Sequence, residues 1–588
     1  MPASEPGAAA AEMSNQSLGS GWLAVGAGLA HGFLMLLAFP PFGVGFLSLF
    51  AVVPLAYVGV LAARRGWGVP LPGAGWFRRL WQRLRVPLLA SLGILPMQLY
   101  EHQFINDISR LGYVPLAAAM SLMAGLFIAL LMAITSRLPR IPVALVVPVL
   151  WAGLEVFRGE LIATGYSWLL VPLPLIDVPF VAGAASITGI YGVSFLAAVP
   201  AGLIADALLP PRRLMFSSAM AAATVALCIA GLALAPGESA APPFRIAVVQ
   251  TNIPQDNKLE WATSQRLTDF ARFLKLTREA AASKPDVIVW PETMFPGTFL
   301  DPAAVEAERR AGLVRRVDHA PTTDFHDRLV ALQKELGIPM LVGGLGIDNL
   351  RIVNDGQGLE FKDDGHFNSV FLIRDGAVDP VRYDKQALTP FGEIMPYIEY
   401  WPWLQKQLLD LAANGMTFDL TAGRTARAFH LANGSGGAVA AATPVCFEMT
   451  KPGVCRELAL QGGAKPTVLI NVTNDGWFGS FVPGREQHLQ IARWRALEMG
   501  VPVVRSANTG ISAFIDARGR VEQRGVDGSP RGAMVDGVLV GDVRPAVPGT
   551  IYARTGDVLG WTCLAATCLM AVAAGLGKRA GRNEERPG

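Results

Sequence analysis

Long apolar segments recur along this chain and limit the folds that it can adopt. A helix needs about 20 mostly apolar residues to cross the hydrocarbon core of a bilayer. Only 16% of the 588 residues are charged, compared with about 25% in ordinary soluble proteins. We therefore expect a polytopic α-helical membrane bundle of about eight spans, at 23–39, 45–63, 86–104, 112–135, 141–157, 186–206, 214–235 and 557–576.

The charged residues divide the chain into parts. Regularly spaced charges occupy a long stretch between the seventh and eighth apolar segments, which is typical of a globular domain. The net charge of +3 is too small to indicate a nucleic-acid partner. We expect four parts: a disordered N-terminus at 1–22, a bundle of seven spans at 23–242, a globular domain at 243–550, and a last span with a tail at 551–588.

Basic residues in the short loops predict the orientation, because loops on the cytoplasmic side carry an excess of Lys and Arg. Every second loop is basic, which places both termini in the cytoplasm and the globular domain on the opposite face of the membrane. These residues are Arg64, Arg65, Arg78, Arg79, Arg83, Arg85, Arg137, Arg140, Arg212, Arg213, Lys578, Arg579, Arg582 and Arg586.

Alternating strands and helices are expected in the globular domain. Apolar strand patterns fall at 244–250, 286–293, 339–347, 368–376, 436–448, 467–475, 501–510 and 512–521. Helical patterns fall between them at 264–283, 324–336, 403–412, 450–462 and 485–500. Buried strands that alternate with helices favour a layered α/β domain.

Polar residues that can perform chemistry follow three of these strands, where layered α/β domains tend to place their sites. Glu292 ends WPE, Lys385 and Glu393 lie in RYDKQALTPFGE, and Cys446 and Glu448 lie in TPVCFE. A thiolate is a nucleophile, a carboxylate can take its proton, and an ammonium group can stabilise an oxyanion. The combination predicts acyl transfer through a thioester.

Each of these residues also has a structural interpretation. Cys446 alone is more often a small core residue than a catalytic one, or it forms a disulfide with Cys455. Glu292 alone could be a surface loop residue and Lys385 a solvated one. The seven histidines have no spacing typical of a metal site, so no metal or other cofactor is expected.

The order of Glu292, Lys385 and Cys446 resembles the nitrilase superfamily, whose members use a Glu–Lys–Cys triad on an αββα sandwich. This match covers roughly 243–545. With the apolar segments, the chain resembles the apolipoprotein N-acyltransferase family. The resemblance rests on LEVFRGELIATGYSW, ITGIYGVSFL, QTNIPQDNKLEW, WPET, KQALTPFGEIMP, NVTNDGWFG and ARWRALEMGVPVVRSANTGIS.

This resemblance implies a role for each catalytic candidate. Cys446 would be the nucleophile, Glu292 the general base, and Lys385 the group that stabilises the oxyanion. Glu393 and Glu448 would support them.

Three aromatic residues would bind substrate by the same resemblance: Trp261 and Trp477 near the substrate entrance, and Phe447 directly after the nucleophile. Interfacial packing is the alternative for both tryptophans. The family usually has tyrosine where Phe447 stands, so the hydrogen bond of that hydroxyl is lost and the aromatic face is kept.

The function implied by the resemblance is the transfer of an acyl chain from a phospholipid, typically phosphatidylethanolamine, to an apolipoprotein. The acceptor is the α-amino group of an N-terminal diacylglyceryl-cysteine. The site would be the bacterial inner membrane, with the catalytic domain in the periplasm. A membrane-tethered amidase that acts on a small amide is an alternative. A transporter with a ligand-binding outer domain is another, but it predicts ionisable residues in mid-span, and few are present.

Two further segments bear on the membrane. The stretch 396–413 is rich in aromatic residues and in leucines at helical spacing, which indicates a segment on the lipid surface. A helix packed on its own domain is the alternative. Glu101 and His102 lie at the end of a span, where we expect them to face water unless they have a function.

Overall fold

The computed structural model describes residues 6–69, 73, 75–210, 212–254, 263–310, 316–317, 320–354, 359–401, 403, 407, 420–434, 436–526 and 532–576. Trp261, the leucines at 404, 408, 409 and 411, and the basic tail lie outside the described residues. The predictions made for them therefore have no structural outcome.

The chain forms two compact units. The helical unit comprises Met1–Ala233 and Asp557–Gly588, and the sandwich unit comprises Leu234–Gly556. We expected the domain to begin at 243 and end at 550. The sandwich unit starts earlier because the Arg518 side chain donates to the carbonyl of Pro236 over 2.7 Å. It ends later because Arg456 donates to the carbonyl of Ala553 over 2.8 Å.

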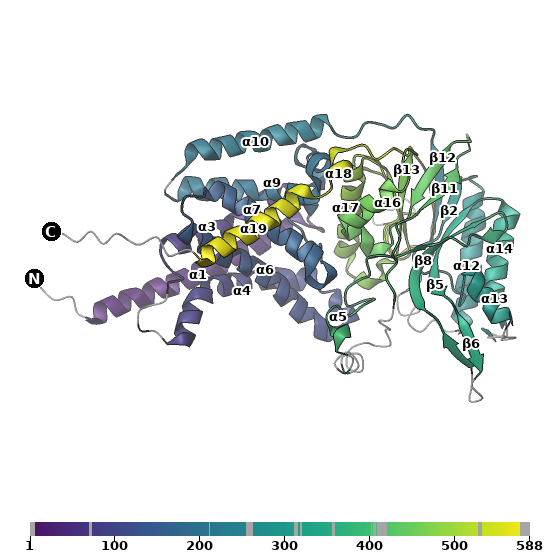
Figure 1. Ribbon diagram of the computed structural model, residues 1–588, viewed down its shortest axis with the longest axis horizontal. Coiled ribbons are helices and arrows are strands. Elements are labelled where there is room, and N and C mark those ends of the chain that lie inside the picture. Colours follow the sequence, from purple (N-terminus) through teal and green to yellow (C-terminus); the bar gives the residue numbers. More distant parts are fainter. Residues whose placement is uncertain are drawn as a thin grey trace, which may run out of the picture. The chain divides into compact units, whose positions relative to one another are not determined.

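All eight apolar segments are helical (Figure 1). Among the described residues, six helices are both long and apolar enough to cross a membrane. Helix α4 carries four arginines in its first ten residues, and α7 has only 14 residues before it continues as the π-turn Phe157–Leu161. The helices are α1 (Pro6–Ala38), α2 (Ser48–Ala51) with α3 (Val53–Arg64), α4 (Trp76–Glu101), α6 (Arg110–Arg137), α7 (Val143–Val156), α9 (Ala185–Leu208), α10 (Leu214–Ala233) and α19 (Val558–Leu576).

The N-terminal segment differs from the expectation. Disorder was expected at 1–22, but helix α1 begins at Pro6. The segment includes four consecutive alanines at 8–11, and alanine has the highest helix propensity of all residues. The sequence ahead of the first apolar segment therefore extends that helix.

Glu101 and His102 are buried, so the expectation that they face water is wrong. The His102 ring lies 5.8 Å from that of Tyr166, and its Nδ1 atom is 2.9 Å from the carbonyl oxygen of Gln98. The chain after α7 folds back over this end of α4, which removes both side chains from solvent.

Arg158 and Glu155 hold this irregular chain segment in place. Arg158 donates to the carbonyl of Trp168 over 2.8 Å, and Glu155 accepts from the Val171 amide over 2.8 Å. The two charged groups lie 4.0 Å apart and are both buried. Glu155 and Arg158, both in the LEVFRGELIATGYSW stretch, therefore order the backbone at Trp168 and Val171.

The sandwich unit contains two sheets between helices, as Figure 1 shows with α12 (Thr263–Ala281) and α14 (Thr323–Leu336) on one side and α16 (Pro452–Leu460) and α17 (Val482–Met499) on the other. One sheet has the order β10-β8-β5-β2-β1-β17 and the other β11-β12-β13-β14-β15-β16. This is the predicted αββα arrangement. The strands are β1 (Phe244–Gln250), β2 (Val287–Val289), β5 (Met340–Asp348), β8 (Gly365–Arg374), β10 (Tyr383–Asp384), β11 (Ala428–Ala432), β12 (Ala438–Ala442), β13 (Thr467–Thr473), β14 (Val503–Ala507), β15 (Ala513–Ile515), β16 (Val521–Arg524) and β17 (Gly537–Val543).

Parallel pairing in both sheets places several strand ends along a common edge. Strands β1, β2 and β5 are parallel neighbours, and so are β12, β13 and β14. Their apolar residues are almost all buried, which is why these strands read as continuous apolar runs. The predicted strand at 436–448 is shorter in the structure: β12 ends at Ala442, and Cys446 begins a short 3-10 helix.

Candidate active site

Glu292, Lys385 and Cys446 come from three separate elements and are brought together in the sandwich unit. Glu292 follows β2, Lys385 follows β10, and Cys446 follows β12. They are 4%, 1% and 8% exposed, respectively. The interpretation of Glu292 and Lys385 as solvated surface residues is therefore wrong.

Lys385 is the centre of a buried ion cluster. Its Nζ atom lies 2.8 Å from Glu393 Oε2 and 3.5 Å from Glu292 Oε1. It also donates to the Thr389 hydroxyl over 3.3 Å. Because two carboxylates face one ammonium group, the cluster retains a negative charge that can accept a proton.

Two asparagines that the sequence analysis missed hold Glu292. The side-chain amide of Asn368 donates to Glu292 over 2.7 Å and to Glu393 over 2.9 Å. The backbone amide of Asn474 donates to the other Glu292 oxygen over 2.8 Å. These bonds fix the orientation of both carboxylates. Both asparagines lie at the ends of predicted strands, but their bonds to Glu292 join residues that are far apart in the sequence, so no local pattern identifies these contacts.

The charges in the cluster stabilise one another. Burial lowers the pKa of the Lys385 ammonium group, but Glu393 and Glu292 outweigh this effect and leave the pKa above its usual value. Burial raises the pKa of Glu393, but Lys385 outweighs this and leaves the pKa below its usual range. Lys385 is therefore a fixed cation that can face a developing oxyanion.

The Cys446 thiol is buried beside this cluster. Burial raises its pKa to about 12, Glu292 adds to the rise, and Lys385 opposes it. The Cys446 backbone has a φ of 47°, in the left-handed region that non-glycine residues rarely occupy. Such strain is typical of functional positions. The thiol is thus protonated at neutral pH and needs a base during attack.

A second buried network lies next to Cys446. His488 Nε2 is 3.3 Å from the carbonyl oxygen of Cys446, and its Nδ1 is 2.8 Å from Asp475 Oδ1. Arg505 forms an ion pair with Asp475 and donates to Asn471 over 3.0 Å. The Asn471 amide in turn donates to the Pro444 carbonyl over 3.0 Å. The network therefore binds the chain on both sides of Cys446, and the sequence analysis did not identify it.

Glu448 has a structural place next to the triad. Its Oε1 atom accepts from the Tyr383 hydroxyl over 2.8 Å and from the Gln386 amide over 2.6 Å. Its Oε2 atom accepts from the Val445 amide over 2.7 Å. Glu448 therefore ties the Lys385 segment to the Cys446 turn. Burial raises the pKa of this carboxyl, and the Val445 bond opposes the rise.

Cys455 does not form a disulfide with Cys446, because both thiols are free. Cys455 is buried, and its sulfur lies 3.2 Å from the Glu448 carbonyl oxygen. The disulfide interpretation is therefore wrong. No group of three or more His, Cys, Asp or Glu side chains among the described residues could hold a metal ion.

Two protein-family models match this chain, one in the helical unit and one in the sandwich unit. The family model of the apolipoprotein N-acyltransferase N-terminal domain matches residues 31–203, and that of carbon-nitrogen hydrolase matches residues 245–544. An amidase of the nitrilase superfamily from Nesterenkonia AN1 is a solved structure with 16% identity and a TM-score of 0.33. That match covers 55% of this chain and 96% of the amidase.

Two curated relatives extend across both units. The apolipoprotein N-acyltransferase of Geobacter metallireducens is 32% identical over 73% of this chain and 73% of its own length. That of Bradyrhizobium diazoefficiens is 32% identical over 72% of each chain. This chain belongs to the apolipoprotein N-acyltransferase family. The predicted family and enzyme class are thereby confirmed.

Two aromatic residues of this family member lie close to the candidate catalytic residues. Phe447 is 8% exposed, and Lys451 Nζ lies 5.8 Å from the centre of its ring. The Trp477 ring would lie 3.4 Å from a Cβ atom added at Gly392, in the turn before Glu393. Both side chains are thus placed beside the Lys385–Cys446 region.

Exposed aromatic residues lie on both sides of Glu393 in the sequence of this family member. Their side chains are between 52% and 75% exposed, well above the usual exposure of large apolar groups. Exposed aromatic residues that cluster in this way mark an interaction surface. The cluster comprises Phe391, Tyr397, Tyr400, Trp401 and Trp403.

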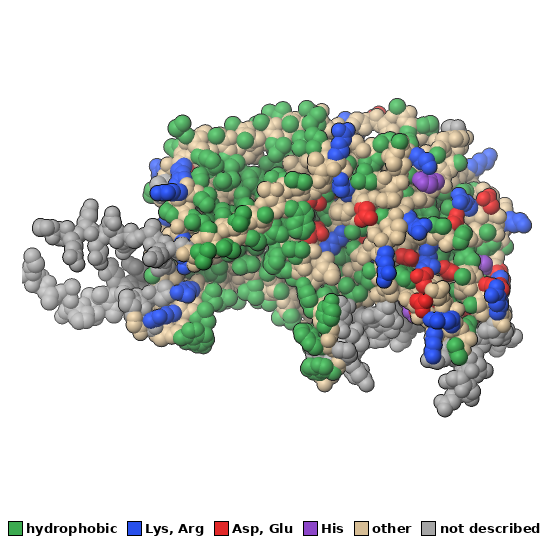
Figure 2. Space-filling model, viewed as in Figure 1, with side chains coloured by type: hydrophobic (Ala, Val, Ile, Leu, Met, Phe, Trp, Pro, Cys, Tyr) green, Lys and Arg blue, Asp and Glu red, His purple; other side chains and the backbone are tan. Residues whose placement is uncertain are grey.

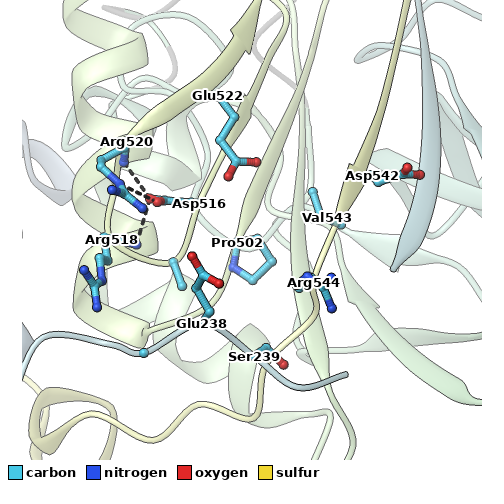
Figure 3. Close-up of a pocket in the computed structure, with 12 residues that line it drawn as sticks. Glu238, Ser239, Pro502, Asp516, Arg518, Arg520, Glu522, Asp542, Val543 and Arg544 are labelled. Atoms are coloured by element: carbon cyan, nitrogen blue, oxygen red, sulfur yellow. Dashed lines mark hydrogen bonds and ion pairs between the residues drawn. The ribbon is translucent and has the colours of Figure 1, made fainter. Parts of the chain in front are cut away.

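A cleft of about 190 Å³ lies where the chain enters the sandwich unit (Figure 3). Its lining includes Glu238, Arg520 and Arg544 but none of the catalytic candidates. The Ser239 hydroxyl donates to the Pro545 carbonyl over 2.6 Å at its border. The cleft therefore lies beside the entering segment, and no candidate catalytic residue lines it.

Proposed function

We propose that this chain transfers an acyl chain from a phospholipid to the α-amino group of an N-terminal diacylglyceryl-cysteine, through a thioester on Cys446. The observation that supports this most directly is the burial of a thiol beside a lysine and two carboxylates. Family membership supports the same activity.

In the first half-reaction, the Cys446 sulfur attacks the ester carbonyl of the phospholipid. Glu292 takes the thiol proton, which the raised thiol pKa requires. Lys385 stabilises the oxyanion of the tetrahedral intermediate. The C–O bond then breaks, and Glu292 returns the proton to the leaving lysophospholipid oxygen. Cys446 retains the acyl group as a thioester.

In the second half-reaction, the α-amine of the acceptor attacks the thioester carbonyl. Glu292 takes the proton of the amine, the C–S bond breaks, and the proton passes to the Cys446 sulfur. This produces an amide and restores the thiol. Because one residue carries the acyl group between two substrates, the kinetics would be ping-pong.

The helices of this chain suit two lipid substrates. In the part of the chain that the structure describes, six helices are long and apolar enough to cross a membrane. Helices α10 and α19 immediately flank the sandwich unit in the sequence. This connectivity would keep the thiol at a bilayer and raise the local concentration of its substrates. The exposed aromatic cluster at Phe391–Trp403 would dock on the lipid surface, where such side chains are favoured.

We also propose a bacterial inner membrane with the sandwich unit on the periplasmic side. The basic loops at 137–140 and 212–213 lie together, since Arg213 donates to the carbonyl of Pro139 over 2.6 Å. Shared placement of basic loops at one end of the helical unit agrees with the positive-inside rule. Phosphatidylethanolamine is the proposed donor.

The test is acyl transfer by the purified full chain. It is incubated with phosphatidylethanolamine and a diacylglyceryl-cysteine peptide, and the N-acylated peptide is measured by mass spectrometry. We expect the peptide product with the native chain and with Cys455→Ser, and none with Cys446→Ser. Hydrolysis of small amides without peptide acylation would contradict the proposal and favour a membrane-tethered amidase.

A further inference from the structure

Helix α4 extends beyond the part of it that packs in the helical unit. Its buried residues begin at Val86, and none of the ten residues before Val86 is buried. The 26-residue helix has a length of about 39 Å at 1.5 Å per residue. The hydrocarbon core of a bilayer is about 30 Å thick. The helix is therefore longer than this thickness by about 9 Å, which corresponds to about six residues. We call residues 76–85 the basic segment.

One face of the basic segment is apolar. Trp76, Leu80 and Leu84 follow one another at a spacing of four residues, with Phe77 and Trp81 beside them. At 3.6 residues per turn, the five side chains fall within an arc of about 140°. Trp76 is 73% exposed and Phe77 is 76% exposed. This face is not covered by the rest of the described helical unit.

The opposite face of the basic segment is cationic. Arg78, Arg79, Arg83 and Arg85 share this face with Gln82. The sequence contains no acidic residue between Glu12 and Glu101, so no neighbouring carboxylate along the chain offsets the four charges. Figure 2 shows basic and apolar side chains side by side at the end of the helical unit where α4 begins.

We propose that the basic segment lies in the membrane interface and binds the headgroups of anionic phospholipids. Its tryptophans and leucines would enter the lipid surface, as the apolar face of an interfacial helix does. Its guanidinium groups match phosphate in charge and geometry, and each arginine adds to the attraction for an anionic leaflet. Charge complementarity therefore favours an anionic lipid over a zwitterionic one and over a second copy of this chain. This binding is independent of the acyl-transfer reaction.

The experiment is a lipid titration of the purified, delipidated full chain, followed by native mass spectrometry. Phosphatidylglycerol and phosphatidylcholine with the same acyl chains are added separately. We expect the native chain to bind phosphatidylglycerol in preference, more weakly as the salt concentration rises. The variant with Arg78→Gln, Arg79→Gln, Arg83→Gln and Arg85→Gln should lose most of this preference.

Two further variants distinguish binding by the basic segment from a general effect of positive charge. Replacing the same four arginines with lysine should retain most of the preference for the anionic lipid. A matched control with Arg137→Gln, Arg140→Gln, Arg212→Gln and Arg213→Gln removes the same charge from other basic loops and should retain it too. If the four-glutamine variant cannot be purified, Arg79→Gln with Arg83→Gln should still reduce the preference measurably.

Three results would overturn the proposal. They are equal binding of both lipids by the native chain, an equal loss in the matched control, and a dimer that disappears when Trp76 and Trp81 are replaced with alanine. The last result would assign the apolar face to a second copy of the chain. None of these results depends on acyl transfer, so failure here leaves the proposed function intact.

Discussion

The Lys385 ammonium group lies 2.8 Å from the Glu393 carboxylate, closer than the 3.5 Å that separates it from Glu292. Lys385 is therefore held mainly by Glu393. Glu292 is held by the amides of Asn368 and Asn474 instead. We infer a division of tasks between the two carboxylates, in which Glu393 fixes the lysine and Glu292 moves the proton.

Glu393→Gln tests this division. The amide cannot neutralise Lys385, so the ammonium group should turn toward Glu292 and leave the position in which Glu393 holds it. We expect the turnover number for peptide acylation to fall roughly 100-fold. Glu306→Gln, which removes an exposed carboxylate paired with Arg310, should leave turnover unchanged. Turnover of Glu393→Gln within about twofold of the native value would contradict the inference.

The raised thiol pKa predicts the pH dependence of Cys446 alkylation. An ordinary cysteine has a pKa near 8.5, whereas burial followed by Glu292 raises that of Cys446 to about 12. A raised pKa means less thiolate at every pH below it. Iodoacetamide should therefore modify Cys446 slowly at pH 8 and faster as the pH rises beyond 9, with Cys446 modification measured by peptide mass spectrometry.

Glu292→Gln should change alkylation and turnover in opposite directions. Removal of the Glu292 charge lowers the thiol pKa, so alkylation at a given pH should become faster. Loss of the base should reduce peptide acylation by about 100-fold to 10,000-fold. An alkylation rate of the native chain that levels off near pH 7 would indicate a preformed thiolate. It would contradict both the raised thiol pKa and the faster alkylation expected of Glu292→Gln.

His488→Ala tests the network next to Cys446. His488 lies 3.3 Å from the Cys446 carbonyl oxygen and 2.8 Å from Asp475. Without the imidazole, the strained backbone at Cys446 should relax, and the sulfur should move away from the position needed to attack the substrate carbonyl. We expect kcat to fall about 10-fold to 100-fold with little change in KM. The exposed His430 provides the control, and His430→Ala should retain the native kcat. An unchanged kcat in His488→Ala would show that this network does not position Cys446.

Two adjacent glycines offer a test of how Glu292 is positioned. A Cβ atom at Gly343 would lie 2.3 Å from the Pro291 carbonyl oxygen and 2.8 Å from Glu292 Cα. At Gly344 the nearest atom would be 3.5 Å away, which is an ordinary contact. Gly343→Ala should therefore displace Glu292, reduce peptide acylation and lower the free energy of unfolding by about 1–3 kcal/mol. Gly344→Ala should do neither. Equal effects of the two substitutions would show that close packing at Gly343 does not position the base.

The sequence predicted the layered domain and the catalytic candidates because both follow from local patterns. Continuous apolar runs identified the buried strands, and Glu292 and Cys446 lie at the ends of two such runs. Lys385 follows the two-residue strand β10, which no apolar run marks. Glu292 and Cys446 follow strands that have parallel neighbours, one in each sheet, whereas Lys385 follows β10, which pairs antiparallel with β8.

The supporting residues could not be predicted in the same way, because their partners are distant in the sequence. Asn368 is 76 residues from Glu292, and His488 is 42 residues from Cys446. Their contacts depend on the register between strands and on the packing of α17, which no local pattern specifies. Burial of Glu101 and His102 was missed for the same reason, since it depends on the segment that contains Tyr166.

The most direct test of the account is to trap the acyl group on the enzyme. The full chain is incubated with a phospholipid whose acyl chain carries an alkyne, without an acceptor peptide, and the site of labelling is found by mass spectrometry. We predict a label on Cys446 that neutral hydroxylamine removes and that added diacylglyceryl-cysteine peptide takes up as an amide. A label that persists in Cys446→Ala, or peptide acylation by that variant, would contradict the central claim.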